Sequence, residues 1–363
     1  MTTYVWLAGT SGVGKSTVGW QLQRVLDRLG VSAAFVDADQ LRNTAGVDSP
    51  EELFVAGGIG AVEAGFSRAG ATMIVVAGMV DDEPHLSRLL PQVDRSDVFV
   101  IYLSATDDTI SDRVVKRRWN VELLPESIEY ARRFDTAWVD MVVDTSSYSP
   151  DRIAVDLAPQ VVELARSSRS PANVEERVVA DPPALTVLTG AGGVGLSTTG
   201  FLAFLQRAWA GHAVGYLDSH QLGFLGSDPR APEGAALRAA NTVSVAAVMG
   251  KAGVESVVIA ADPSTACALA DLSDAAQMFW LDASDATIES RHRARAEGGG
   301  PPLAGDHRIG LDEPGIRAAV TSAITEARDE SLRPSGATII STDGLAADRV
   351  AEAINSIAIA VPD

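Results

Sequence analysis

The sequence contains almost no cysteine. Cys267 is the only cysteine among 363 residues, so no disulfide can form within the chain. Disulfide-stabilised scaffolds belong to oxidising compartments, whereas a reducing compartment keeps thiols free. We therefore expect a cytoplasmic protein in which Cys267 is a small buried apolar residue.

Long apolar runs are also absent from the sequence. No stretch reaches the roughly 18 apolar residues that a membrane-spanning helix requires, and the N-terminus has no basic region of the kind that opens a secretory signal. We therefore expect neither a membrane span nor secretion.

Positive charge is scarce. Lysine and arginine total 29 against 48 aspartate and glutamate residues, which gives a formal net charge of −19. Such a surface repels nucleic acids and anionic membranes unless basic residues cluster, and the sequence contains no basic stripe. The composition thus favours a small-molecule substrate over nucleic acid or membrane. The length of the chain suits two domains of about 180 residues.

One of only three lysines lies in the segment GTSGVGKS at residues 9–16, which has the spacing of a complete phosphate-binding loop. Its glycines allow successive amides to face one point, and the following helix adds its positive N-terminal end. We expect Lys15 to reach the β- and γ-phosphates of ATP, and Ser16 to offer its hydroxyl to Mg²⁺. The predicted cofactor-binding residues are Gly9, Thr10, Ser11, Gly12, Val13, Gly14, Lys15, Ser16 and Thr17.

The residues around this loop support the prediction. An apolar run at 4–8 is typical of a buried strand, and apolar residues then recur at helical spacing until Gly30. An ordinary strand-to-helix turn is the alternative. It leaves the lysine at this position unexplained.

Strands and helices alternate along the first half. Strand-like runs at 4–8, 33–36, 72–77, 98–103 and 141–143 are separated by helical patterns, which predicts a parallel sheet with helices on both faces. A segment rich in Ser, Pro and charge then interrupts the pattern. We predict a first domain at 1–168, a linker at 169–184 and a second domain at 185–363.

The second half repeats the first. Residues 5–42 align without a gap with residues 186–223, and three later segments match in the same order with small offsets. Unrelated domains can share one glycine loop but rarely the order and spacing of four segments. We therefore predict a tandem duplication.

Two acids follow the second predicted strand in the stretch VDADQLR. Asp37 and Asp39 are two residues apart, so in an extended segment they share a face at the ligand-binding edge of the sheet. We expect Asp37 to hold Mg²⁺ with Ser16, and Asp39 to accept the proton of an attacking hydroxyl. Capping of the next helix is the alternative. Arg42 is either a ligand for an anionic group of the acceptor or a solvated surface residue.

Four stretches together resemble the small-molecule kinase branch of the P-loop proteins, which includes gluconate, shikimate, adenylylsulfate and nucleoside monophosphate kinases. They are GTSGVGKS, VDADQLR, VVAGMVDD and LSATDDTISDRVVKRRW, and the resemblance covers residues 1–168. The resemblance implies an α/β fold with a five-stranded parallel sheet of order 2-3-1-4-5 and a mobile lid, and the duplication predicts two tandem domains of this fold. It also implies ATP and Mg²⁺ as ligands.

The resemblance assigns roles to two arginines that lie four residues apart and share a helix face. The residue matching Arg113 packs on the adenine, and the residue matching Arg117 reaches the phosphates, which places Arg117 with Lys15 and Asp39 among the catalytic residues. Guanidinium groups suit both stacking and bidentate phosphate binding. An exposed charged helix is the alternative.

The second copy has lost three charged groups. Leu196 replaces the loop lysine, His220 replaces the second acid and Gly223 replaces Arg42, while Ser197, Asp218, Arg291 and Arg295 remain. Phosphoryl transfer depends on positioning and charge stabilisation, so we predict a pseudokinase half. We expect it to contact the first half, and a homo-oligomer stays open.

These observations predict an ATP-dependent kinase that phosphorylates a hydroxyl of a small polar metabolite. A nucleotide-sensing regulatory protein with little turnover is the alternative, favoured by the altered second copy. A nucleic-acid end kinase is a third reading that the charge of −19 opposes.

Sequence elements that mark gluconate or adenylylsulfate kinases are not visible, so the identity of the phosphate acceptor stays open. Asp81 and Asp82 face acceptor or metal, or cap a helix.

Overall fold

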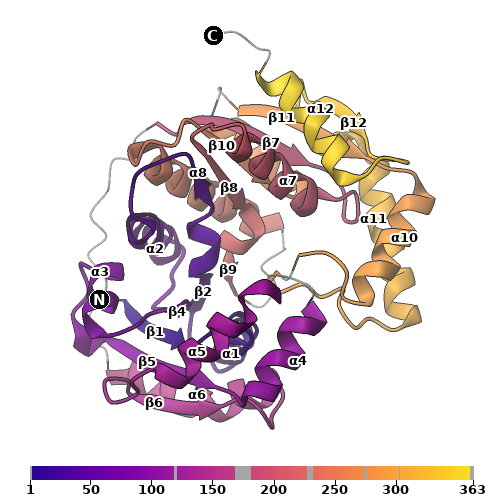
Figure 1. Cartoon of the computed structure of the whole chain (residues 1–363). Helices are drawn as coiled ribbons and strands as arrows, with labels where there is room; N and C mark the ends of the chain where they lie inside the picture. Colours follow the sequence, from indigo (N-terminus) through magenta and orange to yellow (C-terminus); the bar gives the residue numbers. More distant parts are fainter. Residues whose placement is uncertain are drawn as a thin grey trace. The chain divides into compact units, whose positions relative to one another are not determined.

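The computed structural model (Figure 1) describes residues 2–117, 121–167, 181–226, 232–273, 276–301 and 303–359. The chain forms two compact units, and each contains one six-stranded sheet. Most of the predicted linker, residues 169–184, lies outside the described residues, so its bounds stay a prediction.

The sheet of the first unit contains the five predicted parallel strands. Its order is β6-β5-β1-β4-β2-β9, and the five parallel strands follow the predicted order 2-3-1-4-5. The central strands are fully buried, as expected for a parallel sheet with helices on both faces. The parallel strands are β1 (Thr3–Ala8), β2 (Ala33–Asp37), β4 (Met73–Ala77), β5 (Val98–Ser104) and β6 (Met141–Asp144).

A sixth strand corrects the prediction of five strands per sheet. The short strand β9 (Phe224–Leu225) pairs antiparallel with β2, where Phe224 lies opposite Phe35. A strand of two residues has too few positions to show a period, which is why the sequence pattern did not reveal it.

Six α-helices of the first unit fall within the described ranges. α1 begins directly after the loop because Gly14 adopts a left-handed conformation (φ 99°) and turns the chain into the helix. Its buried face, which includes Leu22 and Leu26, packs toward β2 and β4, and α1 also packs against α6. The helices are α1 (Lys15–Arg28), α2 (Glu51–Arg68), α3 (Glu83–Leu89), α4 (Asp107–Arg117), α5 (Leu124–Arg133) and α6 (Pro150–Ser167).

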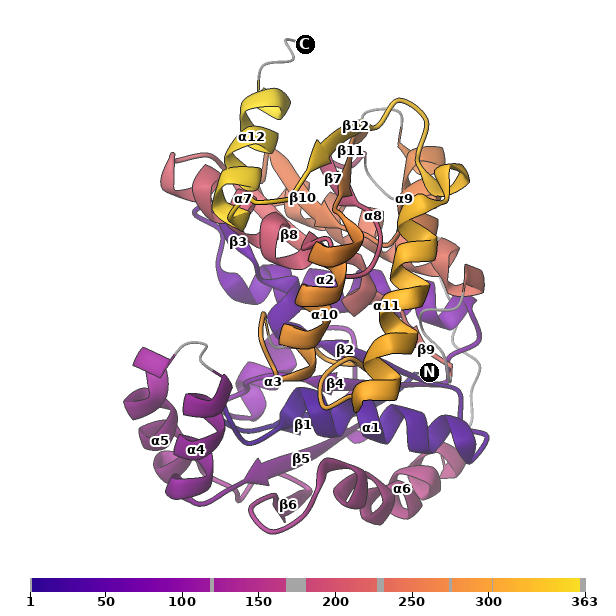
Figure 2. The same cartoon turned by 90° about the vertical axis from the view of Figure 1, so that its right-hand side faces the viewer.

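The second unit has the same strand order, β12-β11-β7-β10-β8-β3, again with one short antiparallel strand at the edge. Figure 2 shows α10 running beside α11. The strands are β7 (Ala184–Thr189), β8 (Val214–Asp218), β10 (Ser256–Ala260), β11 (Ala276–Asp282), β12 (Thr338–Ser341) and β3 (Thr44–Ala45). The helices are α7 (Leu196–Trp209), α8 (Ala235–Lys251), α9 (Pro263–Leu272), α10 (Asp285–Ala296), α11 (Glu313–Arg328) and α12 (Ala347–Ile359).

The two compact units are not the two continuous halves of the sequence. The segment that contains β3 belongs to the second unit, and the segment that contains β9 belongs to the first. Each sheet is therefore completed by a strand from the other half of the sequence. The matching strand orders are what a duplication would produce, and the duplication itself stays a prediction.

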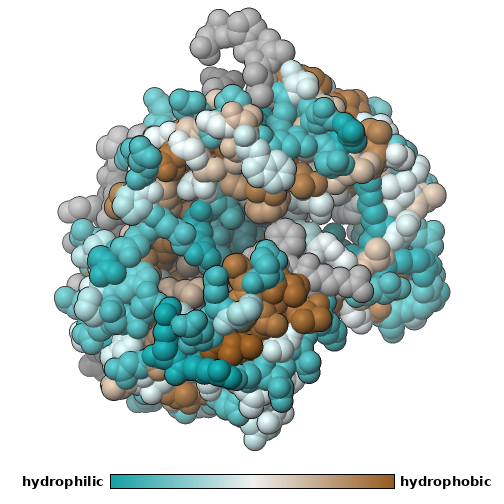
Figure 3. Space-filling model, in the orientation of Figure 1, coloured by the Kyte–Doolittle hydropathy of each residue, from teal (hydrophilic) through white to brown (hydrophobic). Residues whose placement is uncertain are grey.

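The visible surface in Figure 3 is mostly hydrophilic, with hydrophobic residues gathered in smaller patches. This agrees with the large excess of acidic residues in the sequence. Within the described ranges, every helix is either too short or too polar to cross a bilayer.

Candidate nucleotide-binding site

The first loop connects β1 to α1 and has the backbone shape that its glycines allow. Gly9 adopts φ 141°, and a Cβ atom there would lie 2.5 Å from the carbonyl oxygen of Leu103. Any other residue at position 9 would therefore push the loop away from β5. The close approach fixes the loop at the carboxyl end of β1, where open parallel sheets bind ligands.

Lys15 lies over the loop that it follows. Its side chain is buried, and its Nζ donates a hydrogen bond to the carbonyl oxygen of Thr10 at 3.0 Å. The hydroxyl of Thr10 donates in turn to the carbonyl oxygen of Ser127 on α5 at 2.7 Å. The ammonium group thus lies against the backbone of the loop, as the motif predicts for a cation that is to meet the outer phosphates.

Ser16 and Asp37, which the sequence predicts to be metal ligands, are joined by a side-chain hydrogen bond. Asp37 ends β2 and is buried, and burial raises the pKa of its carboxyl group to about 6, with the negative charge of Asp39 adding to the effect. Hydrogen bonds from the Ser16 side chain and the Asp39 amide act in the opposite direction. Hydroxyl and carboxylate oxygens are the ligands that Mg²⁺ prefers, so these residues fit that ion.

Asp39 and Arg42 contact each other. Arg42 Nη2 lies 2.9 Å from Asp39 Oδ1, and Arg42 also forms an ion pair with Glu51. The capping alternative applies to Asp37, which accepts the Asp39 amide at 3.0 Å, and not to Asp39. The Asp39 side chain is 44% exposed and therefore open to an acceptor. Arg42 is already neutralised by two carboxylates, so an anionic acceptor would have to replace one of them.

Arg113 braces the loop from α4. Its Nη1 donates to the carbonyl oxygen of Val13 at 3.2 Å and to the hydroxyl of Thr145 at 3.0 Å, and its Nη2 donates to the Thr145 carbonyl oxygen. The guanidinium plane is thereby fixed between the loop and the segment that follows β6. The contacts of Thr145 with Arg113 and the loop were not predicted, because a single threonine after a strand carries no recognisable signal.

Arg117 is the last residue of α4. Its side chain, and all of Arg118, lie outside the described part of the structure, so the predicted phosphate contact of Arg117 stays a prediction.

Asp82 caps α3 by accepting the amide of His85 at 2.7 Å, as the capping alternative proposed, while Asp81 lies 3.2 Å from His85 Nδ1.

The second loop reproduces the frame of the first. Gly190, Gly193 and Gly195 have φ values of 147°, 85° and 100°, against 141°, 87° and 99° at Gly9, Gly12 and Gly14. Ser197 Oγ donates to Asp218 Oδ2 at 2.7 Å, and burial raises the pKa of Asp218 to about 6. The two loops therefore differ in side-chain charge and not in backbone shape.

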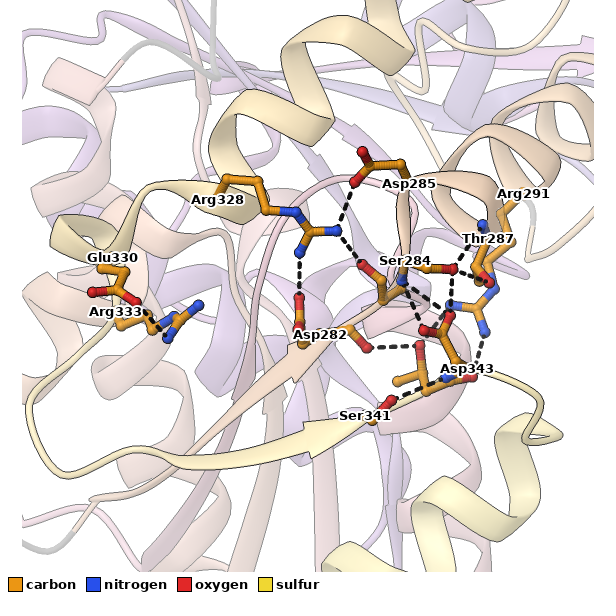
Figure 4. Close-up of polar contacts among 12 residues, drawn as sticks. Asp282, Ser284, Asp285, Thr287, Arg291, Arg328, Glu330, Arg333, Ser341 and Asp343 are labelled. Atoms are coloured by element: carbon orange, nitrogen blue, oxygen red, sulfur yellow. Dashed lines mark hydrogen bonds and ion pairs between the residues drawn. The ribbon is translucent and has the colours of Figure 1, made fainter.

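Arg291 in α10 repeats the brace of Arg113. It donates to the carbonyl oxygen of Val194 at 2.7 Å and to the hydroxyl of Thr342 at 2.9 Å. Figure 4 shows it beside Asp343, in the polar cluster at the ends of β11 and β12. A cavity of about 710 Å³ opens over this loop and is lined by both Ser197 and Asp218.

Comparison with known proteins supports the kinase-like fold. The family model for adenylylsulphate kinase matches residues 1–109. None of the curated proteins compared with this chain matches it.

Three solved kinases are similar in part. A sugar kinase from Janibacter sp. is 16% identical over 47% of this chain and all of its own, with a TM-score of 0.32. A gluconokinase from Sinorhizobium meliloti is 18% identical over 46% of this chain and 94% of its own, with a TM-score of 0.31. The APS kinase from Mycobacterium tuberculosis, solved with AMPPNP and APS, is 20% identical over 46% of this chain and 98% of its own, with a TM-score of 0.31.

Similarity at these sequence identities and TM-scores does not identify the substrate of this protein. The family match covers the loop, both acids after β2 and the third and fourth parallel strands. Residues 1–109, which contain the complete phosphate-binding loop, are similar to the adenylylsulphate kinase family.

Proposed function

We propose that the first loop is the active site of an ATP-dependent kinase that phosphorylates a hydroxyl of a small polar metabolite. The observation that carries the proposal is the arrangement around Lys15. Its ammonium group lies against the loop. Ser16 is the next residue in the sequence, and its side chain is hydrogen-bonded to Asp37 at the end of β2. Simple nucleotide binding does not require a further carboxylate that is exposed to solvent beside this pair. Asp39 supplies such a carboxylate.

The reaction is an in-line displacement. The acceptor oxygen forms a bond to the γ-phosphorus while the bond from that phosphorus to the β,γ-bridging oxygen breaks, and ADP leaves with the electron pair. The proton of the acceptor hydroxyl passes to the carboxylate of Asp39. Ser16 and Asp37 would hold Mg²⁺, which would supply neutralisation of the phosphate charge.

Charge stabilisation at this site comes from the loop amides and from Lys15. The amides are held by the glycine conformations and need no reorganisation during the reaction, which is the property that makes such donors effective. Arg117 is the second cation that we propose for the transferring group. Arg113 acts through the loop, because its guanidinium group binds the carbonyl oxygen of Val13.

The acceptor is expected to be rich in hydroxyl groups. Asp39, Arg42 and Glu51 form a connected set with one positive and two negative charges. Hydroxyl donors can bond to the exposed oxygens of Asp39 without breaking these ion pairs, whereas an anionic acceptor meets a net negative set.

A product screen tests this proposal. The protein is incubated with Mg²⁺, ATP and pooled polar metabolites, and mass spectrometry is used to search for a metabolite that gains one phosphate. We expect Lys15→Ala to abolish the product and Lys251→Ala, at the end of α8, to leave it unchanged. A product that persists in Lys15→Ala, or no product from a broad pool, would contradict the proposal.

A nucleotide-responsive regulatory protein is the second candidate. It is favoured by the second loop, which keeps its backbone shape and a cavity but has Leu196 where Lys15 stands in the first. This candidate predicts nucleotide binding without any phosphorylated product in the same screen.

A further inference from the structure

The cavity over the second loop has the size of a small-molecule site. Its volume is about 710 Å³, within the roughly 300–1,000 Å³ typical of ligand pockets. Its walls are residues 190–199 of the loop, the ends of β8 and β10, and the segment after β12. A ligand that fills it would meet both the loop and residues of the segment after β12.

The features that hold a nucleotide are kept in this cavity. The loop glycines have the conformations of the first loop, and the start of α7 adds its positive end. The hydroxyl of Ser197 and the carboxylate of Asp218 lie 2.7 Å apart and offer oxygen ligands to a divalent cation. Arg291 holds the loop against Thr342, as Arg113 does in the first unit.

A carboxylate occupies one edge of the second loop. Glu326 Oε2, from α11, accepts a hydrogen bond from the amide of Gly192 at 3.1 Å. Gly192 is the third residue of the loop, before the amides that surround the inner phosphates. The corresponding residue of the first loop, Ser11, is exposed. An acidic side chain of the protein thus stands where an outer phosphate would approach.

Glu326 is held in this position by its own helix. Two residues further along α11, Arg328 donates to Asp285 at 2.6 Å, to Asp282 at 3.2 Å and to the carbonyl oxygen of Ala283 at 3.0 Å (Figure 4). These contacts tie the end of α11 to the end of β11 and the start of α10. The carboxylate at Gly192 is therefore part of a braced structure.

The cations that line this cavity, Arg291, Arg295 and Arg308, come from α10 and the segment after it and not from the loop. Asp306 is almost fully buried and binds Arg295 at 2.6 Å and Arg308 at 2.7 Å. Arg308 is partly exposed and also interacts electrostatically with Asp218. Leu196 contributes no charge. One partly exposed guanidinium group, that of Arg308, therefore acts near Asp218, while the loop itself has no cationic side chain.

Gln221 forms part of the cavity wall. It is 1% exposed, and its amide nitrogen donates to the carbonyl oxygen of Ala304 at 3.1 Å. Its Oε1 has no hydrogen-bond partner among the described residues. This oxygen has almost no accessible surface, so it is an unsatisfied acceptor within the wall and not a contact point for a ligand.

We propose that the second loop binds a nucleoside diphosphate with Mg²⁺, that it prefers the diphosphate to the triphosphate, and that Glu326 stands where the terminal phosphate would lie. The preference follows from two differences from the first loop, and both affect the outer phosphate. The second loop lacks the lysine that would attract this phosphate, and the carboxylate of Glu326 would repel it. No chemical step occurs at this site. The proposal rests on the second loop alone and holds whether or not the first loop transfers phosphate.

A direct titration tests the preference. The first loop is weakened by Lys15→Ala, and the protein is titrated with fluorescent mant-ADP and mant-ATP in excess Mg²⁺. We expect the diphosphate to bind about tenfold more tightly, the effect of one like-charge contact at a partly buried site. Glu326→Gln keeps an oxygen that can accept the Gly192 amide but removes the charge, so we expect it to bring the two affinities to within about threefold. Glu330→Gln, on an exposed side chain just beyond α11, is the matched control and should leave the preference unchanged.

Two further measurements locate the bound nucleotide. The double variant Lys15→Ala/Ser197→Ala should lose the remaining binding. Amide hydrogen exchange of the Lys15→Ala protein with ADP should show protection at residues 190–199 that exceeds that at 9–17, a result that does not depend on how the double variant folds. Equal or tighter triphosphate binding, an unchanged preference in Glu326→Gln, or protection confined to residues 9–17 would each overturn the proposal.

Discussion

Phe224 should stabilise a sheet that is otherwise built from the first half of the sequence. It lies in β9, is fully buried, and its ring centroid is 5.6 Å from that of Phe35 on β2. Nearby, Gln23 Nε2 donates to the carbonyl oxygen of Gly226 at 3.1 Å. Truncation of Phe224 to alanine therefore removes aromatic packing from the edge of the first sheet.

The expected cost is large for a residue in so short a strand. Replacement of a buried phenylalanine by alanine typically costs about 3–5 kcal/mol, because apolar contacts are lost and the cavity closes only in part. Phe35 is itself fully buried, so it would face that cavity. Against a total stability of about 5–15 kcal/mol for a typical domain, the first unit would lose a substantial fraction of its stability.

Denaturant unfolding measures this loss, and hydrogen exchange shows which unit bears it. We expect Phe224→Ala to lower the unfolding free energy by about 3 kcal/mol or more, with faster exchange in β2 and little change in β8. Trp209→Ala is the control, since that side chain is 76% exposed and should shift stability by no more than about 0.5 kcal/mol. A loss below about 1 kcal/mol, or faster exchange confined to the second unit, would refute the assignment of β9 to the first sheet.

Three other substitutions test the first site. The pKa of Asp37 lies near 6 in the folded protein and near 3.8 unfolded, so the folded state binds more protons between these values and stability falls as the pH rises through that window. Asp37→Asn should remove this slope and stabilise the protein by about 3 kcal/mol at pH 7 in thermal unfolding, while abolishing phosphorylation; a destabilised variant would contradict the burial argument. Gly9→Ala should abolish nucleotide binding at the first loop, because its Cβ would meet the Leu103 carbonyl oxygen; binding within a few-fold of wild type by calorimetry would count against the loop geometry. Thr145→Val removes the hydroxyl that bonds Arg113 and Val13, and should raise the nucleotide Kd about tenfold; an unchanged Kd would show that Arg113 does not act through the loop.

The parallel strands and the phosphate-binding loop were predictable because their signals are local and regular. Buried parallel strands are continuous apolar runs, and the loop is a fixed spacing of glycines with one lysine. The pairing of Asp37 with Ser16 also follows from the order of loop, helix and strand.

Contacts between distant segments were not predictable. β9 contributes only two residues to the first sheet, and Glu326 reaches Gly192 across 134 positions of the sequence. Nothing near Glu326 in the sequence distinguishes it from an ordinary acidic residue on a helix. The ion pair of Arg42 with Glu51 likewise depends on where α2 begins, a boundary that sequence patterns locate poorly.

The lysine of the first loop provides the most direct test of the whole account. Lys15→Leu gives the first loop the residue that the second has at position 196, so the two loops then match at this place. Phosphoryl transfer to an accepted metabolite should fall by about 100-fold or more, since the transition state loses a cation at the outer phosphates, while a diphosphate continues to bind at the second loop. Transfer within a few-fold of the wild-type rate would contradict the assignment of catalysis to the first loop.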